Sequence, residues 1–242
     1  MAITKNDLTS GSDATNQGSK ATASISPTSN ALILVAFEVG FVSSKTDPPL
    51  SPTVTGNGIT YTLITKKGHW ADTANWWNCL YLFRGLAASP SSGAITVDFG
   101  ADTMDAIAYA VSEFVGVDTS GTNGSGAIVQ SASNYADGSD TTTVTLSAFA
   151  DATNNVAFSV SGAGDTGGTP RTFTADTGFS EIYDTGAEYA AVETAWKTGQ
   201  DTSIITLASA SSSGVAGIAV EIKMAAAAPN GLIMLLGDGG LM

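Results

Sequence analysis

The chain has 242 residues, of which 43% are hydrophobic and 13% charged, so it can build a sizeable core and is not a disordered chain. Its 9 basic and 22 acidic residues give a net charge of −13. This charge argues against nucleic acid or an anionic membrane as a partner, because both attract clustered cations. The single cysteine, Cys79, excludes an intrachain disulfide, and its apolar context places it in the core.

The first residues of the chain are polar and small and show little periodicity. We therefore expect residues 1–19 to form an extended N-terminal arm. They contain no basic segment followed by an apolar one, so no signal peptide is expected. The apolar stretches of the chain are also far shorter than the ~20 residues that span a bilayer. We expect synthesis in the cytoplasm without membrane insertion.

Strand signals then follow one another through the first half. Residues 31–39 are a continuous apolar run, which predicts a central strand buried on both faces. The later runs alternate, or are rich in β-branched and aromatic residues, and turn residues separate them. They predict further strands at 59–65, 78–86, 94–100, 104–117 and 127–135.

The second half continues the pattern, with predicted strands at 141–149, 154–162, 187–197, 202–209 and 214–223, and with 171–175 and 179–184 flanking another turn. Residues 187–197 have helical propensity but also alternate, with Glu193 on one face and Val192 and Trp196 on the other. We expect a strand there, because the neighbours are strands and no helix stop signal fits.

About 10 to 12 strands without a long helix predict an all-β fold. We expect a single jelly-roll-like antiparallel β-sandwich over residues 20–224. The arm (1–19) precedes it and a C-terminal interaction tail (225–242) follows it. No repeat with a period of 20 to 50 residues is apparent, which argues against a propeller or solenoid.

Residues that could carry catalysis are few. The only histidine, His69, is expected in a loop, and no G-x-S-x-G motif accompanies it. A glycosidase would need two carboxylates, for which the candidates are Glu113, Glu181, Glu188 and Glu193. Glu38, Glu113 and Glu221 lie on predicted strands and are expected at strand ends or facing solvent. We expect no enzyme activity.

Metal and cofactor signals are equally weak. One histidine and one cysteine are too few for a zinc site. Asn134, Asp137 and Asp140 could share a calcium ion, although Asp and Asn are also ordinary turn residues. We expect no metal and no cofactor.

Two groups of apolar residues are candidates for contact with partners. Trp70, Trp76 and Trp77 are clustered, and aromatic rings can pack in the core, contact another subunit or stack on a glycan. The second group is a strip near the end of the chain, comprising Leu232, Ile233, Met234, Leu235 and Leu236. An apolar strip on an acidic protein indicates an interaction site, which strand addition to a neighbour or to its own sheet would bury.

The order of several segments resembles a known group of proteins. The segments are "SNALILVAFEV", "VTGNGITYTLI", "LYLFRGLAASPSSGAITVDFG", "AYAVSEFVGVDTSG" and "AIVQSASNY". They resemble β-sandwich structural proteins of tailed bacteriophages and prophages, over roughly residues 20–160. The resemblance implies a non-enzymatic virion component, such as a capsid decoration, head-fibre or tail-associated protein. Its partners would be other capsid or tail subunits and itself, and its location the virion. The alternative is a glycan-binding module or adhesin that uses the tryptophans.

Overall fold

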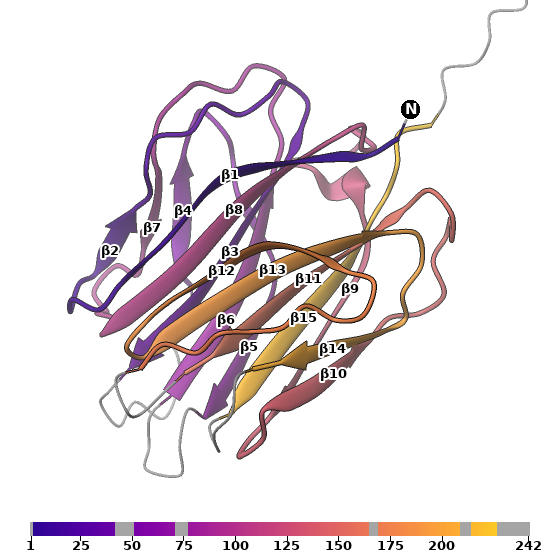
Figure 1. Ribbon diagram of the computed structural model, residues 1–242. Helices are drawn as coiled ribbons and strands as arrows, with labels where there is room; N and C mark the ends of the chain where they lie inside the picture. Colours follow the sequence, from indigo (N-terminus) through magenta and orange to yellow (C-terminus); the bar gives the residue numbers. More distant parts are fainter. Residues whose placement is uncertain (1, 42–50, 71–76, 165–168, 209–213, 227–242) are drawn as a thin grey trace, which may run out of the picture.

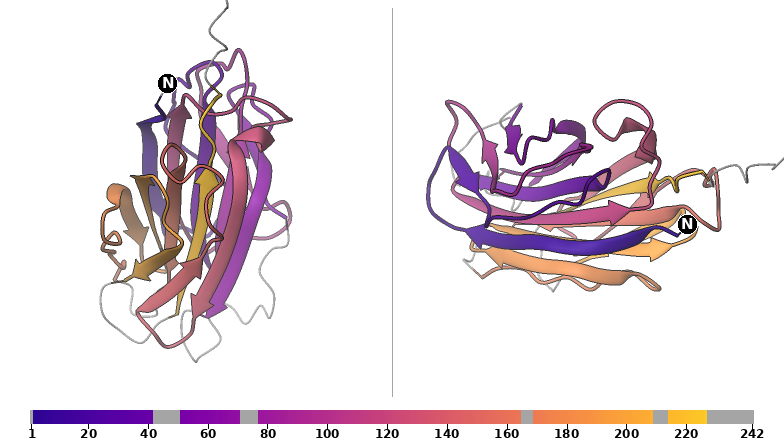
Figure 2. Two further views of the ribbon diagram at one scale, coloured as in Figure 1. Left: turned by 90° about the vertical axis from the view of Figure 1, so that its right-hand side faces the viewer. Right: turned by 90° about the horizontal axis from the view of Figure 1, so that it is seen from above.

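The computed structural model describes residues 2–41, 51–70, 77–164, 169–208 and 214–226. These residues form fifteen strands and one 3-10 helix, Ser125–Ala127. The strands make four antiparallel sheets, two of which are five-stranded and face each other (Figures 1 and 2). The expected all-β class and sandwich architecture are confirmed.

The first large sheet is built from the first half of the chain. Its strand order is β1-β8-β3-β6-β5. The bounds are β1 (Thr4–Asp13), β3 (Leu32–Phe41), β5 (Thr62–Trp70), β6 (Trp77–Gly85) and β8 (Ala106–Val115). The central strand β3 is buried along its whole length, as its continuous apolar sequence predicts.

The second large sheet is built from the second half, in the order β12-β13-β11-β15-β9. Its strands are β9 (Ile128–Ala136), β11 (Val156–Ala163), β12 (Ser180–Ala187), β13 (Ala190–Thr198) and β15 (Val215–Ile222). The strand expectation for 187–197 is confirmed, because most of this segment forms β13, whose inner face contains Val192 and whose outer face contains Glu193.

A small sheet covers the outer face of each large one. A three-stranded sheet in the order β2-β7-β4 covers the large sheet of the first half, and a two-stranded sheet, β10-β14, covers that of the second half. The bounds are β2 (Ser19–Ala21), β4 (Thr53–Gly56), β7 (Ile95–Asp98), β10 (Thr141–Thr145) and β14 (Ser203–Leu207). Both faces of the central strands are therefore shielded from water, which explains why they lack a hydrophilic side.

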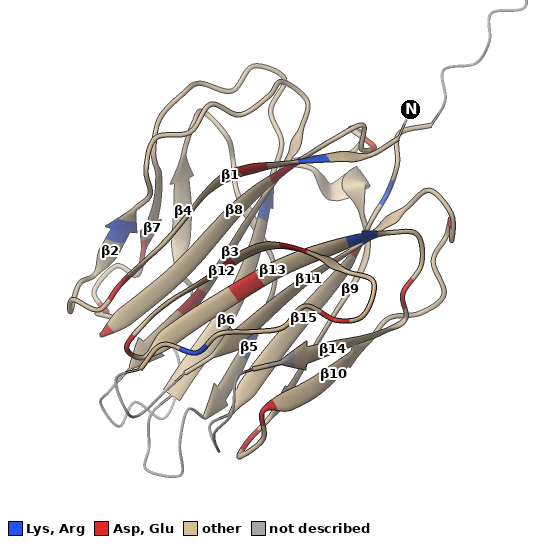
Figure 3. Ribbon diagram, viewed as in Figure 1, with Lys and Arg blue, Asp and Glu red and all other residues tan. Residues whose placement is uncertain are grey.

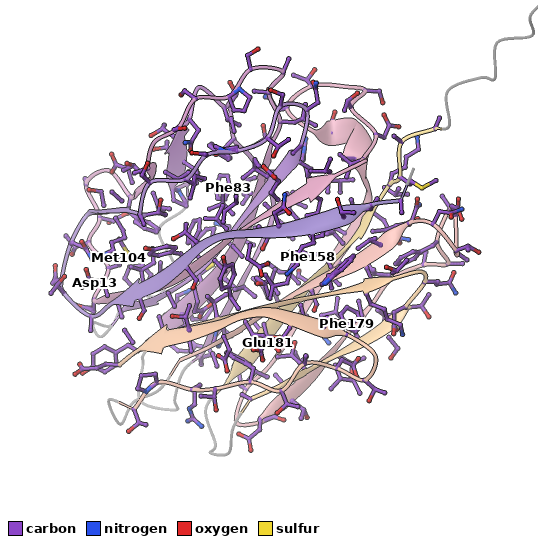
Figure 4. All side chains as sticks on the ribbon, turned by 45° about the horizontal axis from the view of Figure 1, so that its top comes forward. Asp13, Phe83, Met104, Phe158, Phe179 and Glu181 are labelled. Atoms are coloured by element: carbon purple, nitrogen blue, oxygen red, sulfur yellow. The ribbon has the colours of Figure 1, made fainter. Side chains whose placement is uncertain are left out.

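The largest core lies between the two five-stranded sheets. There Leu34, Leu82 and Phe114 of the first sheet meet Phe158 and Ile218 of the second. A separate aromatic-rich core lies beneath the outer sheet of the first half, and smaller ones lie beneath β10 and β14. Figure 4 shows Phe83 and Met104 on the outer side of the first sheet and Phe158 between the large sheets.

The two halves of the chain share one topology. In the first, β1 pairs with β8, β2 with β7 and β3 with β6; in the second, β9 pairs with β15, β10 with β14 and β11 with β13. An isolated bridge between Phe173 and Ala208 takes the place of the β4–β7 pairing. The registers agree in detail, since Ile64 and Ile182 are bulged out at corresponding positions of β5 and β12. The fold is thus an internal structural duplication.

The predicted segments from 31–39 to 214–223 overlap strands, except 171–175, which contains only an isolated bridge at Phe173. Three further strands lie where none was predicted: β1, β2 and β4. The segment 1–19 differs most, because most of it forms β1, paired with β8 along the edge of the first sheet. Its polar composition suits a strand that lies at an edge and is only half-buried. The expected extended arm is therefore not confirmed, and neither is a single jelly roll over 20–224.

Candidate functional site

The chain ends of the described body lie side by side. The backbone N–H of Ala225 donates to the carbonyl oxygen of Gly116 over 2.9 Å. A Cβ placed on Gly116 would lie 2.7 Å from the carbonyl oxygen of Ala2. The described chain therefore starts and stops at one end of the sandwich (Figure 1). The expected interface residues, Leu232, Ile233, Met234, Leu235 and Leu236, lie outside the described residues.

Two of the three candidate tryptophans are paired on adjacent strands. Trp70 of β5 lies opposite Trp77 of β6, with ring centroids 4.7 Å apart in an edge-to-face arrangement of 83°. Trp77 also lies over Gly68, where a Cβ would be 2.3 Å from its ring. Both residues are half-buried, and the ring nitrogen Nε1 of Trp77 is buried. Trp76 lies outside the described residues.

His69 is not in a loop, contrary to expectation. It lies on β5, is 0% exposed, and its Nε2 lies 2.7 Å from Oε1 of Glu38, which is also 0% exposed. Strand register explains the meeting, because Glu38 continues the inward row of Leu34 and Ala36 on β3. The pair therefore lies inside the sandwich, towards one end.

Asn78 adds a third buried polar group and lies directly opposite His69 across β5 and β6. Its side-chain N–H donates to the carbonyl oxygen of Tyr189 over 2.7 Å, which ties the first sheet to the turn between β12 and β13. Gly162 of β11 leaves room for the carboxylate, since a Cβ there would lie 2.5 Å from Glu38 Oε2.

The chemistry of this cluster is that of a shared proton. Burial raises the pKa of Glu38, and the adjacent His69 acts in the opposite direction. One proton between the two groups avoids an isolated buried charge. The other nitrogen of His69, Nδ1, has no hydrogen-bond partner among the described residues. Because neither side chain is exposed, the geometry suits a structural contact between β3 and β5 better than a catalytic acid and base.

The glutamates on strands also differ from expectation. Glu38, Glu113 and Glu221 were expected at strand ends or facing solvent, yet each is at most 1% exposed. The carboxylates of Glu113 and Glu221 accept several hydrogen bonds from neighbouring groups. These bonds compensate for the loss of water, so both side chains can be buried. Of the other carboxylate candidates, Glu193 is buried, whereas Glu181 and Glu188 are exposed.

The candidate calcium residues have other partners. The Asn134 amide donates to the carbonyl oxygen of Thr143, and Oδ1 of Asp137 accepts from the backbone N–H of Trp70. Within the described ranges, no group of three or more His, Cys, Asp or Glu residues could hold a metal. Among these residues there is likewise no helix long and apolar enough to cross a membrane.

Comparison with protein-family models, curated proteins and solved structures found no match to this chain. The contact between Glu38 and His69 was not predicted from the sequence, because it depends on β3 and β5 both pairing with β6, which lies between them in the sheet. The sequence did contain one indication. Glu38 is separated from Leu34 and Ala36 by an even number of residues, so on a strand its carboxylate lies on the same face as these two apolar side chains.

Proposed function

We propose that the chain is a non-enzymatic structural component of a larger assembly, and specifically of a bacteriophage virion, as a capsid decoration, head-fibre or tail-associated protein. It would dock on neighbouring capsid or tail subunits, or on copies of itself. Synthesis in the host cytoplasm would precede its incorporation into the particle. The proposal requires no cofactor.

The observation that carries the proposal is the position of the last described residues together with the sequence that follows them. After Ala225 bonds to Gly116 beside Ala2, the sequence continues into the apolar strip 232–236. The body already buries both faces of its central strands. An apolar strip that follows such a body is best used against another surface, where strand addition would pair its backbone and bury its side chains.

The connectivity of each half supports the same class. Pairing of the first strand with the eighth, the second with the seventh and the third with the sixth is the nested order of a jelly roll. We infer that the chain consists of two jelly-roll-like halves joined through their larger sheets. Jelly rolls are common in viral capsid proteins, which agrees with the segment resemblance over roughly residues 20–160.

The experiment compares the full chain with a double variant in the strip, Ile233→Asp with Leu235→Asp. Sedimentation velocity measures self-association, and mass spectrometry of purified phage particles measures incorporation. We expect the wild-type chain to associate with itself or with particles, and the variant to remain a free monomer, because buried carboxylates oppose docking. The matched control is Ile205→Asp on β14, where the native side chain is 45% exposed.

The control should behave as wild type, since that side chain lies away from the strip in sequence and is already in water. A wild-type chain that is monomeric and absent from particles would contradict the proposal. So would equal association by the wild type and the strip variant.

A second candidate, a glycan-binding module or adhesin, is favoured by one observation. The Trp70–Trp77 pair is half-buried, so part of each indole remains free to stack on a sugar. A glycan array should then lose its signals with Trp70→Ala and retain them with Tyr135→Ala, an aromatic control that is 42% exposed. Absence of signals with the wild-type chain would remove this candidate.

A further inference from the structure

A row of oxygen-bearing side chains crosses the outer face of the second sheet. Asp184 of β12 lies directly opposite Glu193 of β13, and Glu193 lies opposite Ser161 of β11. The hydroxyl oxygens of Ser161 and Thr206 of β14 are 3.3 Å apart. These four residues therefore gather between the large sheet and its cover. The acidic position of β13 is red in Figure 3.

The two carboxylates have bonding capacity that the described protein does not use. Glu193 is 3% exposed, and its Oε1 is buried without a hydrogen-bond partner. Oδ1 of Asp184 is also buried and unpartnered, while Oδ2 accepts from the backbone N–H of Phe173 over 3.0 Å. Such orphaned acceptors are costly in a native interior unless a proton or a cation occupies them.

Burial and neighbouring charges both oppose ionisation of the two carboxyl groups. Burial raises the pKa of Glu193 to about 7, and Asp184, Glu181 and Asp176 add to the effect. Burial also raises the pKa of Asp184, with a further contribution from Glu181. Like charges on directly opposed strand positions repel each other. The neighbouring charges that raise these two pKa values are all negative, so they oppose ionisation of both carboxyls.

The duplicated half provides an internal control. The corresponding row of the first sheet consists of Lys66, Tyr81 and Phe37, in the same pairings. There the aromatic rings stack, with centroids of Phe37 and Tyr81 4.9 Å apart, beneath the outer sheet. The fold can therefore be built with a lysine and two stacked aromatic rings in this row, and the two opposed carboxylates of the second half are not a requirement of the architecture.

We propose that Asp184, Glu193, Ser161 and Thr206 form a binding site for a hard divalent cation, of which Ca²⁺ is the chemical type. Carboxylate and hydroxyl oxygens are the ligands such ions prefer, and water would complete the coordination shell. The cation would engage the free Oε1 of Glu193 and Oδ1 of Asp184 and neutralise both. Because Asp184 is only half-buried and lies on the edge strand β12, the site has a route to solvent. The site does not depend on the assembly role.

The test uses the full chain, freed of metal with EDTA and held at pH 8, where protons compete least. Calorimetric titration with CaCl₂ should show one site, lost in Glu193→Gln and in Asp184→Asn. At one hundred times the dissociation constant, Ca²⁺ should raise the melting temperature of the wild type by about 5 to 10 °C. The matched control is Glu188→Gln, an exposed glutamate at the β12–β13 turn, which should retain both responses.

Circular dichroism verifies that each variant is folded, which is expected because the amides keep the side-chain shapes and remove repulsion. Absence of heat and of a melting shift in the wild type would overturn the proposal and leave the carboxyls as proton-holding groups. Ca²⁺ responses that persist in both folded variants would also overturn it, because the ion would then bind elsewhere.

Discussion

Glu113 and Glu221 occupy the same position in the two halves of the chain and accept equivalent hydrogen bonds. Glu113 of β8 lies opposite Asn6 and accepts from its amide over 2.7 Å, while Glu221 of β15 lies opposite Gln130 and accepts from its amide over 2.7 Å. Each carboxylate also accepts from a backbone N–H in the segment that precedes the central strand, from Thr28 or from Ala150. The duplication thus extends to its buried polar contacts.

We predict that Glu113→Ala and Glu221→Ala destabilise the protein by similar amounts. Each substitution leaves several donors without an acceptor, with an expected loss of about 2 to 4 kcal/mol in the free energy of unfolding. Urea denaturation measures the loss. Glu188→Ala, at an exposed position, should change it by less than about 0.5 kcal/mol. Losses that differ several-fold between the two buried sites would refute their equivalence.

The pair Glu38–His69 should show strong coupling. Removing one partner leaves a buried ionisable group alone, so His69→Leu should lower the free energy of unfolding by about 3 to 5 kcal/mol. Glu38→Leu with His69→Leu should recover part of this loss, because no unpaired polar group remains. A double-mutant cycle in urea gives the coupling energy. Additive effects would show that the two side chains do not interact.

Glu193 should make stability depend on pH. Its pKa is raised from 4.5 to about 7 in the folded protein, which therefore binds the proton more tightly than the unfolded chain. The resulting stabilisation is complete below pH 4.5 and is lost as the pH rises towards 7. Relative to Glu193→Gln, the wild type should lose on the order of 2 to 3 kcal/mol across this window.

Urea titrations in EDTA at several pH values measure this difference without metal. Glu188→Gln should keep the wild-type profile, since its carboxyl is exposed. Parallel profiles for the wild type and Glu193→Gln would contradict a proton held at Glu193.

Removing residues 2–14 should destabilise the fold. The deletion takes away β1 and leaves the edge of β8 unpaired, and it also removes Ile3, which is 6% exposed in the main core. We expect a lower melting temperature and aggregation on heating, measured by circular dichroism and light scattering. A chain ending at residue 226 is the matched truncation and should melt as the full chain does. An unchanged melting temperature after the N-terminal deletion would restore the arm interpretation.

Local sequence patterns were sufficient to predict many of the strands. The run 31–39 predicted a strand buried on both faces, and the alternation of 187–197 outweighed its helical propensity, because period-two patterning reports which face is buried. The same logic failed for β1, whose half-buried edge position does not require an apolar face. An edge strand can consist of polar residues, so composition alone could not distinguish the edge strand β1 from an extended arm.

The amino-acid sequence by itself determined the class: an acidic all-β chain with a buried cysteine and with strands at the alternating segments. These properties depend on composition and on neighbours along the chain. Only the tertiary structure decided that the chain is two halves of one topology, that His69 meets Glu38, and that Asp184, Glu193 and Ser161 form one row. Each of these depends on the register between distant strands, which is set by the packing of whole sheets.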